Sequence, residues 1–324
     1  MYTKVFTKEK WQRANKLNKE LLEDYLIELK SKRRRPSTLQ QYESDGKMIL
    51  CFIQEHMDNR CVLDFNKKDF RRISLWLTEE RKVSNARFNR VFALIRGMME
   101  YAEDEDDYEY DKNLARKIKG LPKEPVREIY FLTDEQIHKI RTYLLEHEMY
   151  RECAYLDISY DSAARIGEVL QIKKDGLLER RYTNIVVGKR GKKFRLLYHY
   201  NSLESLKLYL NSREDNIEAL WIDQDHNHAV TDNTLYDWCI KMRSILHLIE
   251  GKYIPFTPHS FRHSALENYK NGTHYMCKHM GRPEGFSIEE VQVMAHHDNI
   301  DTTKSYLKPQ DNNILEGMFG IKLE

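Results

Sequence analysis

A short segment rich in proline and glycine, Gly-Leu-Pro-Lys-Glu-Pro-Val at residues 120–126, divides the chain and limits the folds open to it. Two prolines and a glycine stop helices and leave few apolar anchors. The chain has 324 residues, which is long for one domain and comfortable for two. We therefore predict an N-terminal domain at residues 1–119, a linker at 120–128 and a C-terminal domain at 129–324.

The sequence before the linker has the apolar periodicity of helices. Such stripes predict helices over residues 8–30, from 37 through 53, over 67–81 and over 84–102. We expect this domain to be entirely helical.

The sequence after the linker mixes helical and strand patterns. Thr133-x-x-Gln136 and Ser287-x-x-Glu290 are capping boxes, each of which opens a helix. A further apolar helical segment is expected to carry Arg165. Two strands are predicted at 183–188 and 194–199, followed by helices near 202–211, 231–249 and 259–269. The predicted fold class is mainly α with a small β-sheet in the C-terminal domain.

The distribution of charge is more informative than its sum. A net charge of +2 is weak for a protein that binds nucleic acid, but it does not exclude one. Two basic runs stand out, and each is either solvated surface or a contact to DNA. The predicted DNA-binding residues are Lys30, Lys32, Arg33, Arg34, Arg35, Arg190, Lys192 and Lys193.

The apolar residues and the cysteines indicate the cellular compartment of the protein. No apolar run approaches the roughly 20 residues that cross a bilayer, so we expect no membrane association. The five cysteines are scattered and form no paired metal motif, which favours reduced thiols in the cytoplasm.

Two arginines in separate segments are suited to stabilise a phosphodiester under attack. They are Arg165, in Ala-Arg-Ile-Gly-Glu, and Arg262, in His-Ser-Phe-Arg-His. Charge builds on the nonbridging oxygens as a nucleophile approaches, and protein cations can neutralise it without a metal. A planar guanidinium binds two phosphate oxygens and is always charged. The alternative is an ordinary ion pair, for example between Arg165 and Glu168.

Two histidines and a late tyrosine extend this set. His259 precedes the second arginine by three residues and shares a helix face with it, whereas His297 must be brought in by the fold. Tyr306 can attack phosphorus if a base or a cationic pocket activates its phenol. A lone histidine is more often an ordinary hydrogen-bonded residue, and we expect that of His263 and His296.

The basic turn between the two strands can supply a proton to the leaving 5′-oxygen of deoxyribose. Lys189 is the candidate general acid and Lys192 is the reserve, although a lysine in such a turn is commonly a phosphate contact or plain surface. The sequence has no carboxylate cluster suited to Mg²⁺, so we expect neither a metal nor another cofactor.

In order and spacing these segments resemble the catalytic domain of the tyrosine recombinases, the phage integrase family. The segments that resemble its boxes are Ala164–Glu168, Gly188–Lys192, His259–His263 and His297–Tyr306. The chain departs from the family at His296, where glycine is usual, and in a longer stretch between His263 and His297.

The resemblance implies a fold, an activity and partners. The fold is a helical, SAM-like core-binding domain followed by a mixed α+β catalytic domain. The activity is site-specific DNA recombination through a 3′-phosphotyrosine intermediate and a Holliday junction, for integration or excision of a mobile element. The expected partners are duplex recombination sites, a tetramer of the chain on DNA, and accessory DNA-bending or directionality factors, at the prokaryotic nucleoid. The implied catalytic residues are Arg165, Lys189, His259, Arg262, His297 and Tyr306.

Other assignments remain open at this point. One is a type IB topoisomerase-like or telomere-resolving enzyme, and another is a DNA-binding protein without catalysis on the same fold. The C-terminal tail is apolar at helical spacing from Ile314 to Ile321, and it packs either on its own domain or on a neighbouring protomer.

Overall fold

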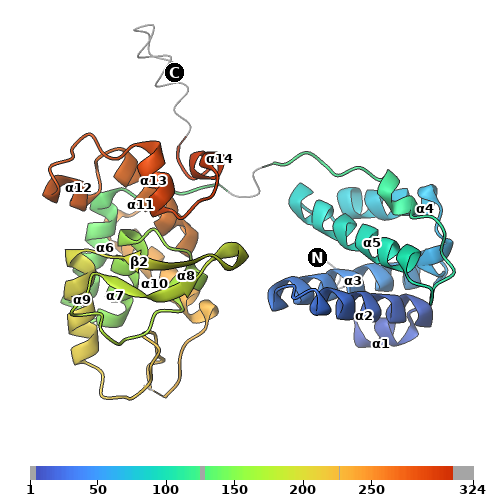
Figure 1. Ribbon diagram of the computed structural model, residues 1–324, viewed down its shortest axis with the longest axis horizontal. Coiled ribbons are helices and arrows are strands. Elements are labelled where there is room, and N and C mark those ends of the chain that lie inside the picture. The colour runs from blue at the N-terminus through green and yellow to red at the C-terminus, as the bar shows by residue number, and fades with distance from the viewer. Residues whose placement is uncertain (1–4, 125–127, 226, 309–324) are drawn as a thin grey trace, which may run out of the picture. The chain divides into compact units, whose positions relative to one another are not determined.

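The structure is a computed structural model that describes residues 5–124, 128–225 and 227–308. The chain forms two compact units, Met1–Glu128 and Ile129–Glu324 (Figure 1). The apolar tail from Ile314 onward lies outside the described residues.

The first unit is helical, as predicted. Its elements are α1 (Lys8–Arg13), α2 (Lys16–Ser31), α3 (Pro36–His56), η1 (Val62–Asp64), α4 (Lys67–Leu75), the π-helical turn η2 (Trp76–Glu80), α5 (Asn85–Asp104) and η3 (Leu114–Lys117). The helix predicted over 8–30 is two helices, because the Asn15 side chain caps α2 by accepting the backbone N–H of Asn18 at 3.3 Å. The Asn15 N–H in turn donates to Asn59 Oδ1 at 2.8 Å, which fixes the break.

The end of the first unit lies along α5. Asn89 accepts the backbone N–H of Leu121 at 2.8 Å and donates to its carbonyl at 2.9 Å. Asn85 donates to the carbonyl of Pro122 at 3.1 Å. Hydrogen bonds therefore attach the chain to α5 as far as residue 122, inside the segment that the sequence assigns to the linker.

The second unit is mainly helical with one small sheet, so the predicted fold class is confirmed (Figure 1). Its elements are α6 (Asp134–Glu146), α7 (Tyr150–Asp161), α8 (Ile166–Val169), β1 (Tyr182–Val187), η4 (Lys189–Gly191), β2 (Lys193–Leu197), α9 (Tyr200–Asn211), α10 (Asp232–Glu250), α11 (Pro258–Lys270), α12 (Tyr275–His279), α13 (Ile288–Met294) and α14 (Ile300–Lys304). The strands β1 and β2 pair antiparallel, with Val187 opposite Lys193. Both predicted capping boxes form, at the starts of α6 and α13.

The helix α11 is the buried centre of the second unit. It packs against α7, α10 and α13, and eleven of its thirteen residues are buried. A helix that is buried on nearly all sides is fixed by its surroundings. Side chains carried by α11 therefore have defined positions.

One expectation is wrong at the end of α7. Arg165 was expected within a helix, but α7 ends at Asp161 and Arg165 is the N-cap of the short helix α8. Ala163 between them has a φ of +49°, in the left-handed region that L-residues rarely adopt. Side chains of α11 stabilise this break, because Tyr269 donates to the Asp161 carbonyl at 2.9 Å and Arg262 donates to that of Ala163.

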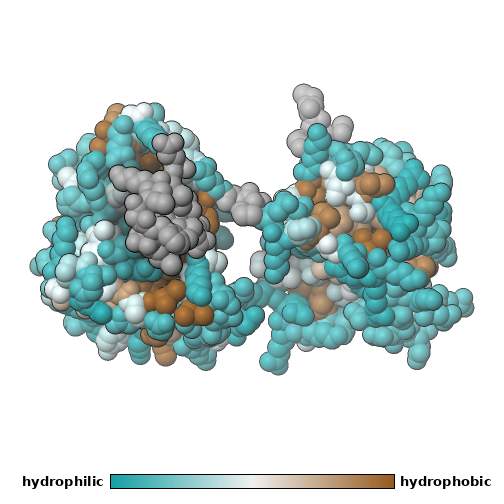
Figure 2. Space-filling model, turned by 90° about the horizontal axis from the view of Figure 1, so that it is seen from above, coloured by the Kyte–Doolittle hydropathy of each residue, from teal (hydrophilic) through white to brown (hydrophobic). Residues whose placement is uncertain are grey.

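The face seen in Figure 2 is mostly polar where residues are coloured. Hydrophilic side chains cover most of the face shown in Figure 2, and apolar side chains form small patches on each unit. In the part of the chain that the structure describes, no helix combines the length and the apolar character needed to cross a membrane.

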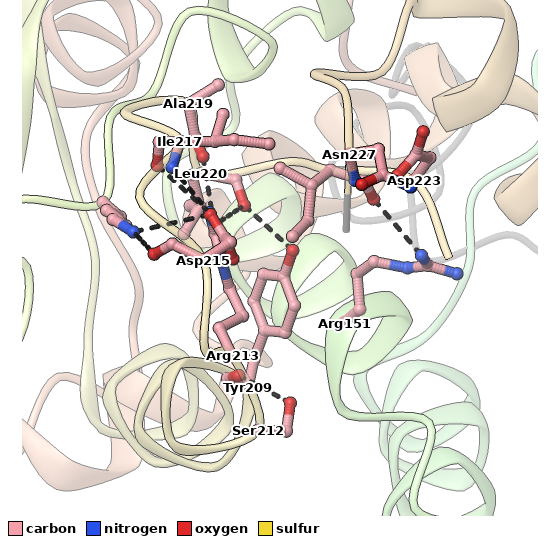
Figure 3. A network of polar contacts seen from close by, with 12 residues as sticks. Arg151, Tyr209, Ser212, Arg213, Asp215, Ile217, Ala219, Leu220, Asp223 and Asn227 are labelled. Atoms are coloured by element: carbon pink, nitrogen blue, oxygen red, sulfur yellow. Dashed lines mark hydrogen bonds and ion pairs between the residues drawn. The ribbon is translucent and has the colours of Figure 1, made fainter. Parts of the chain in front are cut away.

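A buried arginine organises the long connection between α9 and α10 (Figure 3). All five N–H groups of Arg213 have partners. Nε and Nη2 bind the carboxylate of Asp215 at 2.7 and 2.6 Å, and the remaining donors reach the carbonyls of Ile217, Ala219 and Leu220. These hydrogen bonds hold the pKa of Asp215 well below its usual range. The connection is therefore built around one guanidinium.

We predict that Arg213→Met lowers the free energy of unfolding of the second unit by about 3–5 kcal/mol, because it removes a buried ion-pair partner of Asp215 and five hydrogen bonds. Asp215 would keep the Ile217 N–H and Leu220 the Tyr209 hydroxyl. Urea denaturation of the full chain measures the change. The matched control is Lys173→Ala, which breaks an exposed ion pair to Glu218 nearby and should change stability by less than about 1 kcal/mol. Equal effects of the two variants would contradict the proposed role of Arg213.

Candidate active site

A cavity of about 320 Å³ lies in the second unit where four segments meet. The segments are the start of α8, the turn between β1 and β2 with the adjoining part of β2, the loop before α14, and α14 with the residues after it. The lining residues are Arg165, Lys189, Arg190, Lys192, Phe194, His296, His297, Asp298, Asn299, Thr302 and Tyr306. Four of the six candidate catalytic residues therefore line one cavity.

Arg165 is oriented by Glu168. The carboxylate accepts the Arg165 backbone N–H at 2.8 Å and its Nη1 at 2.9 Å, which is a capping box that also closes an ion pair. Burial acts to lower the pKa of Arg165, but the hydrogen bond and charge of Glu168 raise it overall. The ion pair between Arg165 and Glu168, which the sequence offered as the alternative, does form. Arg165 nevertheless lines the cavity.

Arg262 lies beneath the cavity and joins its walls. Its side chain is 1% exposed. Nη1 donates to the Ala163 carbonyl, and Nη2 donates to the Ala295 carbonyl at 2.7 Å and contacts His297 Nε2 at 2.7 Å. Burial and the nearby charge of Arg165 lower its pKa to about 10. Arg262 therefore remains a cation at neutral pH and connects the two segments that carry Arg165 and His297.

His297 is buried and has both ring nitrogens occupied. Nε2 faces Arg262, and Nδ1 lies 3.0 Å from Thr303 Oγ1. Because Arg262 can only donate, Nε2 is the acceptor and Nδ1 carries the proton. Burial, then the charges of Arg262 and Arg165, lower the pKa of His297 to about 3.

Tyr306 lies among aromatic and cationic groups of its own chain. Its ring centroid is 4.4 Å from that of His263, 5.0 Å from His297 and 5.1 Å from His259. The Arg262 guanidinium carbon lies 4.9 Å from it. His259 is exposed by solvent accessibility, yet its partial desolvation and the charges of His263 and Arg262 lower its pKa to about 4. The phenol thus stands beside one guanidinium and three imidazole rings, whose pKa values are all lowered.

The structure distinguishes the two lysines of the turn. Lys192 already donates hydrogen bonds, because its Nζ lies 2.8 Å from Asp298 Oδ1 and 3.3 Å from the His296 carbonyl oxygen. Lys189 lines the same cavity, and its ammonium has no hydrogen-bond or ion-pair partner within the described residues. Lys189 is therefore the better candidate for a proton donor.

The predicted DNA-binding residues lie in two places. Lys30, Lys32, Arg33, Arg34 and Arg35 are all exposed at the end of α2 and in the turn before α3, where Lys32 pairs with Glu28. Arg190 and Lys192 line the cavity, and Lys193 is exposed at the start of β2. The two clusters belong to different units.

Sequence reasoning missed several contacts in the site. His263 was expected to be ordinary, yet its ring stacks on Tyr306 and its Nδ1 lies 3.0 Å from the Tyr306 carbonyl oxygen. His296 was also set aside, yet it lines the cavity and stacks on Phe194. The sequence signal was present for His263, which closes the His-x-x-Arg-His segment, but nothing in the sequence marks Phe194.

Over residues 5–124, 128–225 and 227–308, no group of three or more histidine, cysteine, aspartate or glutamate side chains is arranged to hold a metal ion.

Comparisons with known proteins agree on one family. Residues 130–313 match the phage integrase family. The SPbeta prophage-derived recombinase-like protein YomM of Bacillus subtilis is 22% identical over 323 residues, covering 94% of this chain and 91% of the relative. Tyrosine recombinase XerA of Thermococcus onnurineus is 25% identical over 293 residues, covering 89% of this chain and 90% of the relative.

Solved structures share the fold. A lambda integrase tetramer bound to a Holliday junction aligns with a TM-score of 0.66 at 16% identity, over 89% of this chain and 76% of that chain. The XerH site-specific recombinase bound to palindromic difH substrate, a post-cleavage complex, aligns with a TM-score of 0.64 at 18% identity, over 86% of this chain and 78% of that chain.

We predict that His259 and His297 stay neutral through the physiological range. Their pKa values are lowered to about 4 and about 3, so protonation begins only well below pH 6. Imidazole NMR of the free protein measures this, with assignments from His259→Gln and His297→Gln. A histidine-containing model peptide in the same buffer is the reference, since an unperturbed imidazole has a pKa near 6.5. A midpoint near 6.5 for either His259 or His297 would contradict the electrostatic description of the site.

Proposed function

The chain belongs to the phage integrase family and is a tyrosine recombinase, an enzyme that cuts and rejoins DNA strands. On this premise we propose that Tyr306 is its nucleophile. One observation carries the proposal. The Tyr306 ring lies against Arg262, His259 and His297 of the same chain, at a cavity that Arg165 and Lys189 also line. The groups that such a reaction needs therefore surround one phenol.

The charge of the cavity supports a phosphodiester as the bound group. Four cations line it, namely Arg165, Lys189, Arg190 and Lys192, against the single carboxylate of Asp298. Asp298 is already paired with Lys192. A preorganised cationic cavity stabilises the pentacovalent transition state, whose negative charge is more concentrated than that of the substrate. We assign that role to Arg165 and Arg262.

The proposed step exchanges one phosphodiester for another. The Tyr306 oxygen forms a bond to phosphorus while the bond between phosphorus and the 5′-oxygen breaks, which leaves a 3′-phosphotyrosine and a free 5′-hydroxyl. The phenol proton passes to a base, and the neutral ring of His259 is our candidate. Lys189 gives a proton to the leaving oxygen. The covalent bond retains the phosphodiester energy, so a 5′-hydroxyl can rejoin the strand without ATP.

We propose that recombination serves the integration or excision of a mobile element, through a Holliday junction formed by a tetramer. The prophage-derived relative supports the mobile-element role, and the lambda integrase tetramer on a Holliday junction supports the assembly. The exposed cluster from Lys30 to Arg35 is our candidate for sequence-independent phosphate contacts in the first unit. A two-site assay should give recombinants and junctions, whereas DNA relaxation without recombinants would favour the topoisomerase-like alternative.

We predict that Tyr306→Phe abolishes covalent attachment and retains DNA binding, because the ring stays in its contacts and only the nucleophilic oxygen is lost. A labelled duplex with a nick beside the scissile phosphate traps the adduct, which a denaturing gel resolves. Tyr253→Phe is the matched control, since Tyr253 is exposed and does not line the cavity. A normal adduct yield from Tyr306→Phe would assign the chemistry to another residue.

We predict that Lys189→Ala slows cleavage by about 10²–10⁴-fold, the usual range for a lost general acid. A substrate with sulfur in place of the scissile 5′-bridging oxygen should recover most of the rate, because a thiolate leaves without a proton. The same substrate should give Arg165→Ala little relief, since that residue acts on the nonbridging oxygens. Rescue of Lys192→Ala in place of Lys189→Ala would move the acid along the turn.

A further inference from the structure

An aromatic stack docks the turn that carries Lys189 onto the loop before His297. The rings of Phe194, in β2, and His296 have centroids 3.8 Å apart and planes at 23°. Both side chains are half-buried and both line the cavity. Two segments that lie far apart in the sequence therefore meet face to face beside the candidate general acid.

His296 adopts an unfavourable backbone conformation at this contact. Its φ is +53°, in the left-handed region, where glycine has no steric cost and histidine does. It also stands where the family that the sequence resembles usually has glycine. Strain of this kind persists when the surrounding contacts compensate for it. The stack with Phe194 is such a contact, and glycine could not make it.

Phe194 also contacts the base of the lysine turn. A Cβ added to Gly188 would lie 2.7 Å from a Phe194 ring carbon and 3.1 Å from Glu168 Oε1. The phenyl ring therefore fills the space between His296 and Gly188. Gly188 also lies against the Glu168 carboxylate, which orients Arg165. Packed groups therefore connect Arg165, the turn that carries Lys189 and the loop that carries His296.

A second contact to the turn is weaker. Lys192 pairs with Asp298 at 2.8 Å, but their side chains are 41% and 63% exposed. Exposed ion pairs contribute little and are screened by salt, whereas a half-buried ring stack adds apolar burial to a favourable ring geometry. The stack is therefore the stronger connection between the turn and the loop.

We propose that His296 is a positioning residue for the general acid, and that its stack on Phe194 holds the turn so that the Lys189 ammonium faces the leaving oxygen. The inference rests on the proposed function, in which Lys189 donates that proton. His296 itself transfers no proton in this scheme. Loss of the stack should displace the turn, and a misplacement of about 1 Å can cost about a hundredfold in rate.

The test is His296→Gly, which suits the left-handed backbone and removes the whole side chain with its ring. Cleavage of the ordinary substrate should slow by roughly ten- to a hundredfold, while the 5′-bridging sulfur substrate should be cleaved near the wild-type rate. Phe194→Leu should behave in the same way, and Phe194→Tyr, which keeps the stack, should recover most of the activity. Rapid cleavage of the sulfur substrate also shows that each variant is folded and that its nucleophile is intact.

Glu148→Gly is the matched control. Glu148 is exposed, lies outside the cavity and has a φ of +55°, so the same backbone change is made away from the site. It should cleave both substrates like the wild type, and a His296→Gly defect that Glu148→Gly shared would overturn the proposal.

Three other results would overturn the proposal. First, His296→Gly could cleave the ordinary substrate at the wild-type rate. Second, the defect of His296→Gly could persist with the sulfur substrate. Third, Asp298→Asn could show a defect as large as that of His296→Gly and be rescued by the sulfur substrate. The last result would assign the docking to the ion pair. Failure of the proposed function is distinguishable, because Lys189→Ala would then not be rescued by sulfur, or Tyr306→Phe would still form the adduct.

Discussion

The buried guanidinium of Arg262 is the interaction on which the rest of the site depends. It donates to carbonyls of two separate segments, at Ala163 and at Ala295, and contacts the ring of His297. Those segments carry Arg165 and His297, so one side chain sets the positions of a second cation and a histidine. Because α11 is itself buried among its neighbours, this arrangement is built into the core of the second unit.

Both segments turn through left-handed residues next to their contacts with Arg262. Ala163 has a φ of +49° and His296 one of +53°. Each turn brings the following segment to the cavity wall, where Arg165 and His297 lie. Left-handed conformations cost free energy in L-residues. The hydrogen bonds from a fully buried arginine offset that cost, and the result is a cavity whose cations are in place before any substrate arrives.

The sequence predicted helix caps, which depend on neighbouring residues, and the residue types that suit the proposed chemistry. The capping boxes at Thr133 and Ser287 formed because a cap involves residues three apart. The candidate catalytic residues were chosen from residue type and order, and four of the six line one cavity. The break before Arg165 was missed, because its stabilising contacts come from Tyr269 and Arg262, about a hundred residues later. The choice between Lys189 and Lys192 likewise depends on Asp298, a partner that no pattern in the turn reveals.

The short helix before Tyr306 gives the site an uneven local stability. Of the five residues of α14 only Thr303 is buried, whereas α11 is buried almost throughout. Segments that bury few side chains open at a small fraction of the global unfolding free energy. Within the described chain, the candidate nucleophile thus follows a helix that buries one side chain, whereas Arg262, one of the two arginines we assign to the phosphate, lies on a helix that is buried almost throughout. If Tyr306 is the nucleophile, its contacts could break and re-form by local opening near α14, while α11 keeps Arg262 in place.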